Sequence, residues 1–158
     1  MIRPYKKHDL PAITDIANRA WQDIYDMFEE TYGHELFRAL TPDRQTCKGA
    51  QIHHQAVHHP EWIYVCEDGG SIVGFVTFSL DRDTGVGQIG NNAVDPARRG
   101  KGYAQLMYQA VLERFREEGM AFASVRTGLD KAHAAARKAY ERAGFDIRHE
   151  DVCYYRKL

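Results

Sequence analysis

The segment from residue 86 to residue 126 constrains the fold more than any other part of the chain, because two strand patterns flank a helical one. Residues 86–94 predict a strand, residues 103–118 an amphipathic helix ended by Gly119, and residues 121–126 a second strand. Strands joined through a helix pair in parallel, so we expect one parallel pair here. The apolar face of the helix is predicted to comprise Tyr103, Leu106, Met107, Ala110, Val111 and Phe115.

The beginning of the chain predicts a strand and then a helix. Pro4, within the strand from Ile2 to Lys6, predicts an edge position because proline cannot donate a hydrogen bond to a neighbouring strand. Asp9 is a suitable N-cap for the helix that follows. The apolar residues of this helix recur at helical spacing: Ile13, Ile16, Ala17, Ala20, Trp21 and Ile24.

The rest of the chain predicts helices, a hairpin and a final pair of strands. Residues 25–60 predict one or two helices, with Thr41-Pro42 as a helix start and His59-Pro60 as a stop. From Trp62 an antiparallel hairpin is predicted, with its turn at Asp68-Gly69-Gly70. The elements predicted last are a helix from Lys131 to Ala143 and strands at Phe145–His149 and Val152–Arg156.

This order of elements predicts an α/β (α+β) fold: a mixed, largely antiparallel sheet with helices on both faces. A chain of 158 residues without repeats or low-complexity linkers predicts one domain over residues 1–158. The formal net charge of -1 provides no overall field for nucleic acid or a membrane surface. With three widely spaced cysteines and no apolar run approaching ~18 residues, we expect a cytoplasmic protein.

The loop VDPARRGKGYA, residues 94–104, leads from the predicted strand into the start of the helix. Unsatisfied N–H groups and the positive end of the helix dipole meet there, and glycines let an anion approach the backbone closely. Arg98, Arg99 and Lys101 add positive charge. The loop therefore predicts a pyrophosphate site, although its glycine spacing excludes a Walker A motif.

Two motifs in this order resemble the GCN5-related N-acetyltransferase (GNAT) family. Arg99, Gly102 and Ala104 match its acetyl-CoA signature Arg/Gln-x-x-Gly-x-Gly/Ala, and residues 136–145 resemble its later helix, which typically ends Tyr-Glu-Lys-x-Gly-Phe. The resemblance covers the whole chain in element order and is specific over residues 93–106 and 133–145. It implies the acyl-CoA N-acyltransferase fold, acetyl-CoA as co-substrate without a metal, and transfer to a primary amine of a small molecule or a protein.

The resemblance also implies where the cofactor binds. In this family the strand matching residues 86–94 has a bulge and splays from the strand matching residues 121–126, so the pantetheine arm pairs with exposed backbone. The Val94 N–H then faces the thioester, while the amides of residues 100–104 face the pyrophosphate. His133 stands where many members have asparagine, and it is either a cofactor contact or a solvated histidine. The expected cofactor residues are Ala93, Val94, Arg99, Gly100, Lys101, Gly102, Tyr103, Ala104 and His133.

Residue roles in the reaction are implied in the same way. Tyr140 occupies the general-acid position of the family, although its helical stripe of alanines is also consistent with simple packing. The glutamate base of some members is Gln88 here, which cannot accept a proton. Asn92, with its neighbour Asn91, could hold a water that accepts the proton, or could satisfy a bulged backbone.

The acceptor side of the site is less well predicted. In the family, the segment after the first helix forms one wall of the acceptor site, so Tyr25 is either a substrate contact or a core residue. For Trp21 core packing is favoured. Glu29 and Glu30 could attract an amine cation or could simply be solvated.

One alternative belongs to a different functional class: an acyl-CoA-binding regulatory module without catalytic activity. The absent glutamate favours that alternative, whereas Tyr140 argues against it. His54 and His58 are one helical turn apart, but they lack the glutamate and third ligand of a zinc site, so no metal is predicted. A homodimer is left open.

Overall fold

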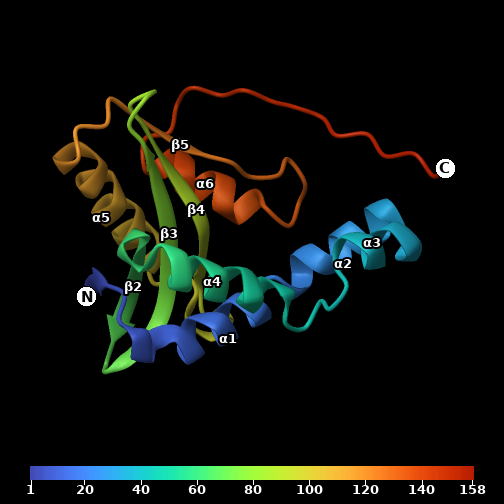
Figure 1. The fold of residues 1–158 in the computed structure, drawn as a ribbon, viewed down its shortest axis with the longest axis horizontal. Helices are drawn as coiled ribbons and strands as arrows, with labels where there is room; N and C mark the ends of the chain where they lie inside the picture. Colours follow the sequence, from blue (N-terminus) through green and yellow to red (C-terminus); the bar gives the residue numbers. More distant parts are fainter.

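A computed structural model describes residues 1–158 and contains one five-stranded sheet in the order β1-β2-β3-β4-β5 (Figure 1). The first four strands pair antiparallel, whereas β4 and β5 pair in parallel, as predicted. The edge position of β1 is also confirmed. The strands are β1 (Ile2–Pro4), β2 (Ile63–Asp68), β3 (Ser71–Asp81), β4 (Val86–Val94) and β5 (Phe122–Val125).

Helices cover both faces of this sheet. Buried side chains of α1 and α4 pack on one face, and those of α5 and α6 pack on the other (Figure 1). The predicted mixed sheet between helical layers is therefore confirmed. No helix combines the length and apolar character needed to cross a membrane. The helices are α1 (Leu10–Ala20), α2 (Gln22–Tyr32), α3 (His34–Leu40), α4 (Cys47–His58), α5 (Tyr103–Glu117) and α6 (Ala134–Arg142).

Several predicted helix features are wrong in detail. The first predicted helix ends at Ala20, and α2 begins at Gln22, so the helical spacing through Trp21 spans two helices. Thr41-Pro42 does not start a helix, because Asp43 forms a turn there by accepting hydrogen bonds from the Gln45 N–H and the Thr46 hydroxyl. Leu106, predicted on the buried face of α5, is 49% exposed, and Tyr108 is buried instead.

The two predicted C-terminal strands are absent. Residues after Ala143 form no regular element, and the tail extends away from the sheet toward α3 (Figure 1). There Tyr155 packs on Tyr32, with ring centroids 5.4 Å apart, and Lys157 pairs with Glu35. A β-rich pattern forms a strand only where a neighbouring strand offers hydrogen bonds, and the tail does not lie along the free edge of β5.

Asp9 precedes α1 as predicted, but its carboxylate does not cap that helix. It accepts two hydrogen bonds of 2.8 Å from the Arg3 guanidinium and one from the Lys6 N–H, and it is 2% exposed. The hydrogen bonds from Arg3 hold the pKa of Asp9 below its ordinary value. The ion pair joins β1 to the start of α1, which positions that helix on the sheet.

Asp9→Asn should lower the free energy of unfolding by about 2 kcal/mol at neutral pH, because a buried charge-assisted pair is lost. A carboxyl with a depressed folded pKa stabilises the fold above its unfolded value of 3.8, and this contribution is lost as pH falls through the folded pKa. We therefore expect the difference in free energy of unfolding between the unmodified protein and Asp9→Asn, measured with urea, to be smaller at pH 3 than at pH 7. Asp15→Asn is the control, since that side chain is 62% exposed. Equal losses for both variants would contradict the assignment.

Candidate active site

A bulge and a splay in the sheet open the site. Val76 pairs with Asn92 and Phe78 with Ile89, so Gly90 and Asn91 together oppose the single residue between them. A Cβ on Gly90 would lie 2.6 Å from the Thr77 hydroxyl oxygen, so a larger residue does not fit the bulge unless its surroundings shift. The pairing of β4 with β5 ends at Ile89. The bulge and splay that the family resemblance implied are thus both present.

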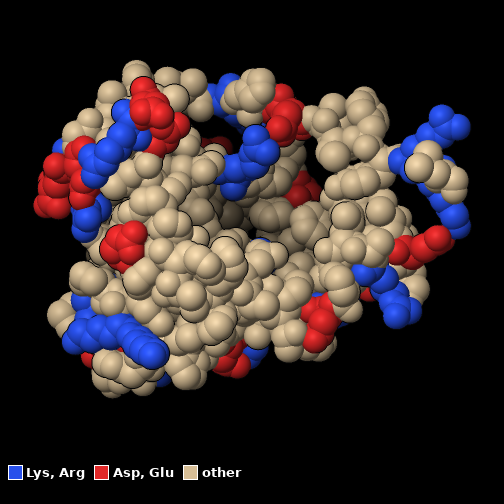
Figure 2. Space-filling view, viewed as in Figure 1, with Lys and Arg blue, Asp and Glu red and all other residues tan.

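Beyond this point lies a cleft of about 640 Å³, a volume typical of small-molecule sites. It is lined by β4, the basic loop, the first turns of α5, the α6 helix and the junction of α1 with α2. Figure 2 shows this face of the molecule hollowed near its middle, with basic and acidic side chains interspersed around it. The predicted residues that line the cleft are Asn92, Ala93, Val94, Arg99, Gly100, Lys101, Gly102, Tyr103, Ala104, His133 and Tyr140.

The basic loop presents unpaired donors to one end of the cleft. Gly100 and Gly102 have φ values of +82° and +81°, in the left-handed region that favours glycine. The backbone N–H groups of residues 100–105 donate no hydrogen bond within the chain. A Cβ on either glycine would meet no atom within 4 Å, so the space beside the loop is open. Free N–H groups at a helix start fit a phosphate group.

Asp95 anchors this loop to α1. The Arg19 guanidinium donates two hydrogen bonds to the Asp95 carboxylate, which also accepts from the Ala97 N–H. Arg19, together with the Ala97 N–H, lowers the pKa of Asp95 to about 2. The carboxylate therefore remains ionised at any physiological pH, and the start of the loop is held against the helix.

Tyr140 lies inside the cleft in a network with Asn92 and Tyr108. The Asn92 amide donates to the Gly90 carbonyl and to the Tyr140 hydroxyl, both at 3.0 Å, while its Oδ1 accepts from the Tyr108 hydroxyl at 2.7 Å. The Gly90 carbonyl can only accept, so it determines which end of the amide faces it. Burial raises the pKa of Tyr108, which keeps its phenol protonated and able to donate.

The Tyr140 hydroxyl consequently acts as an acceptor toward Asn92. Its own proton is not used in that hydrogen bond and is free for a second partner. The Tyr140 ring, 7% exposed, also packs 5.0 Å from the Tyr108 ring and 6.1 Å from the Phe145 ring. The residue is therefore packed and at the same time oriented, so the two interpretations of the sequence are compatible.

His133 stands at the start of α6 and lines the cleft. Its Nδ1 lies 2.7 Å from the Asp130 carboxylate, and Asp130 also accepts from the His133 N–H. Although burial acts to raise the pKa of Asp130, these hydrogen bonds outweigh it and hold that pKa below the ordinary value. Arg137 donates to the Gly128 and Asp130 carbonyls, so it secures the loop before α6.

Tyr25 does not line this cleft. It is 4% exposed, its hydroxyl contacts the Cys47 thiol at 2.9 Å, and it borders a second cavity of about 460 Å³. Trp21 packs against the buried core, as the sequence favoured, and it also lines both cavities. Lys48 of α4 contributes to the second cavity and had no signal in the sequence, because a single lysine in a helix is usually solvated.

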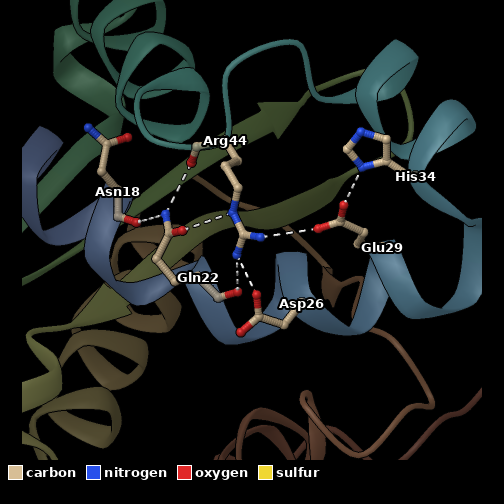
Figure 3. Close-up of polar contacts among 6 residues, drawn as sticks. All are labelled: Asn18, Gln22, Asp26, Glu29, His34 and Arg44. Atoms are coloured by element: carbon tan, nitrogen blue, oxygen red, sulfur yellow. Dashed lines mark hydrogen bonds and ion pairs between the residues drawn. The ribbon is translucent and has the colours of Figure 1, made fainter.

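A polar cluster joins α2 to the segment between α3 and α4 (Figure 3). Arg44, from the segment between α3 and α4, donates to Gln22, Asp26 and Glu29 of α2. Glu29 also contacts the His34 ring at 2.7 Å. Glu29, which the sequence left as a candidate for attracting an amine, is thus paired with other side chains instead.

The structure contains no group of three or more His, Cys, Asp or Glu side chains that could hold a metal ion. The His54 and His58 rings stack 4.0 Å apart, and the His58 Nδ1 contacts the His54 carbonyl. These contacts account for the one-turn spacing of the two histidines.

Comparisons with known proteins match most of this chain. The model of the Acetyltransferase (GNAT) family matches residues 21–145. Mycothiol acetyltransferase of Rhodococcus erythropolis is 32% identical over 76 residues, which are 48% of this chain and only 25% of that protein.

Two solved structures resemble the whole fold. Ard1 of Thermoplasma volcanium has a TM-score of 0.67 at 23% identity. The match covers 94% of the present chain and 84% of the Ard1 chain. The PaiA N-acetyltransferase of Thermoplasma acidophilum, solved in complex with coenzyme A, has a TM-score of 0.71 at 13% identity. This match covers 96% of the present chain and 92% of the PaiA chain. At these identities the likeness concerns the fold alone.

Proposed function

The chain belongs to the acetyltransferase (GNAT) family and has its acyl-CoA N-acyltransferase fold, and from this we propose that it transfers the acetyl group of acetyl-CoA to a primary amine. Acetyl-CoA supplies the acetyl group as a thioester, and the amine nitrogen displaces the CoA thiolate. The acceptor is a small molecule or a protein amine, a choice that the family itself leaves open.

The proposed position of acetyl-CoA is based on backbone N–H groups that have no acceptor within the chain. The free N–H groups of residues 100–105, with Arg99 and Lys101 beside them, would hold the pyrophosphate. The backbone of Ala93 and Val94, beyond the point where β5 stops pairing, would hold the pantetheine arm. His133, which also lines the cleft, would contact the same arm. The cleft therefore suits acetyl-CoA in size, and its residues supply the positive charge and the hydrogen-bond donors that the cofactor needs.

The observation that most supports the proposal is the orientation of the Tyr140 hydroxyl. Because Asn92 donates to its oxygen, the phenol does not give its proton to Asn92, and a group in the cleft could receive it. We assign Tyr140 as the general acid that protonates the departing thiolate. Asn92 is then a positioning residue, held by the Gly90 carbonyl and by Tyr108.

No carboxylate from β4 is available as a base, because Gln88 occupies the expected position and lines the cleft. A water held near Asn91 and Asn92 would accept the amine proton. Such a mechanism needs no further ionisable residue.

Acetyl transfer is tested directly by incubating the protein with acetyl-CoA and a panel of amines. We expect amine-dependent release of free CoA thiol, with an acetylated product seen by mass spectrometry. The panel should contain polyamines, amino acids, aminoglycosides and a peptide with a free N-terminus. Acetyl-CoA binding without release of thiol for any amine would instead favour the inactive acyl-CoA-binding module.

A further inference from the structure

The second cavity, beside the cleft, combines aromatic walls with a single charge. Its volume is about 460 Å³, and among its eleven lining residues only Lys48 is charged. Trp21, Phe28 and Tyr32 supply large flat surfaces, and Tyr155 of the C-terminal tail packs against Tyr32 at one side. Such a cavity suits a ligand with an aromatic or large apolar body and one anionic group.

Lys48 has only neutral partners. Its ammonium donates to the Gln51 side-chain oxygen at 2.8 Å and to the Asn91 side-chain oxygen at 3.3 Å, and it lies 4.5 Å from the centroid of the Trp21 ring. No carboxylate in the chain forms an ion pair with Lys48, although twelve ion pairs between Lys or Arg and Asp or Glu occur elsewhere. Burial lowers the pKa of Lys48, so its charged form has a desolvation cost that a bound anion would offset.

The acidic side chains near this cavity do not compensate that charge. Asp26 and Glu29 are both bound to Arg44, and neither lines the cavity (Figure 3). A cationic acceptor such as a polyamine would therefore meet Lys48 without a balancing carboxylate there. The one charged residue of this cavity therefore favours an anionic group on the ligand.

The position of Lys48 also determines where the anionic group of an acceptor would lie relative to the amine of the same molecule. Asn91, its partner, is a bulge residue of β4 and lines the main cleft, and Trp21 lines both cavities. A carboxylate on Lys48 thus lies at the junction of the two cavities. An amine on the adjacent carbon would be directed to β4, where the acetyl group is proposed to arrive, while the side chain would extend into the aromatic cavity.

We propose that the acceptor is an aromatic α-amino acid whose carboxylate pairs with Lys48 and whose ring occupies the second cavity. This inference rests on the proposed acetyl transfer and specifies its substrate class.

The test compares phenylalanine with phenethylamine, which lacks only the carboxylate, and with alanine, which lacks only the ring. For the unmodified protein, kcat/KM for phenylalanine should exceed that for each of the other two by about tenfold, which corresponds to about 1.4 kcal/mol. Lys48→Met should bring the ratio of phenylalanine to phenethylamine close to one, and Lys48→Arg should retain most of it. Lys7→Met, at an exposed position, is the matched control.

A binding measurement separates this inference from the proposed transfer. Calorimetric titration of the CoA-saturated protein should show about tenfold weaker binding of phenylalanine to Lys48→Met, with phenethylamine unaffected. If no amine is acetylated but this difference is found, acetyl transfer is wrong and the carboxylate site stands. Equal affinities for phenylalanine in both proteins, or a preference for phenethylamine or a polyamine, would overturn the inference.

Discussion

Tyr140→Phe should reduce the turnover number for acetyl transfer by about 100-fold, a loss of about 2.7 kcal/mol of transition-state stabilisation. The substitution removes only the hydroxyl and keeps the ring, which packs on Tyr108 and Phe145. Folding and acetyl-CoA affinity should therefore change little. Steady-state kinetics on any accepted amine, together with a thermal melt in acetyl-CoA, would measure both effects.

A matched control for this substitution is Tyr154→Phe, because Tyr154 is 88% exposed in the tail and the chemical change is the same. Its turnover should remain within the error of the unmodified protein. If Tyr140→Phe retains turnover within a few-fold while its acetyl-CoA melt shift is normal, then Tyr140 only packs. In that case the hydrogen bond from Asn92 has a structural role.

Gly102→Glu should abolish the stabilisation of the protein by acetyl-CoA. The unmodified protein should gain about 2.7 kcal/mol at one hundred times the dissociation constant, which raises the melting temperature by roughly 5–10 °C. A glutamate at this position would place a negative charge beside the N–H groups proposed to hold the pyrophosphate. It would also occupy a left-handed conformation, at a cost of about 1–2 kcal/mol.

Gly119→Glu separates the charge effect from the backbone strain. Gly119 follows the other end of α5 and has a φ of +76°, and a Cβ at this position would likewise meet no atom within 4 Å. This variant should melt at a lower temperature without ligand but keep the full acetyl-CoA shift. A full shift in Gly102→Glu would show that the cofactor binds elsewhere.

Together the two substitutions distinguish catalysis from binding. An active acetyltransferase should lose turnover with Tyr140→Phe and cofactor binding with Gly102→Glu. An inactive acyl-CoA-binding module would respond only to the second change. The pair therefore decides between the two functional classes that the sequence left open.

Much of the fold and the conformation of the basic loop could be predicted from local patterns. The strand bounds Val86–Val94, the turn before β3 and the glycines of the basic loop depend on residues that are near neighbours in sequence. The second cavity could not be predicted, because Trp21, Lys48 and Tyr155 come from distant segments with no shared motif. The C-terminal strands were predicted wrongly for a related reason, since strand pairing needs a partner that local pattern does not supply.

By itself the sequence determined that strands and a helix meet at a basic, glycine-containing loop, because backbone conformation and charge there are properties of adjacent residues. It also placed Tyr140 on a helix with the correct spacing to enter a family motif. Only the tertiary structure decided what the Tyr140 hydroxyl does, since its orientation depends on an amide of β4 and a phenol of α5. In the same way, only folding left the Lys48 ammonium half-buried without a carboxylate partner, because burial and charge pairing depend on which distant side chains come together.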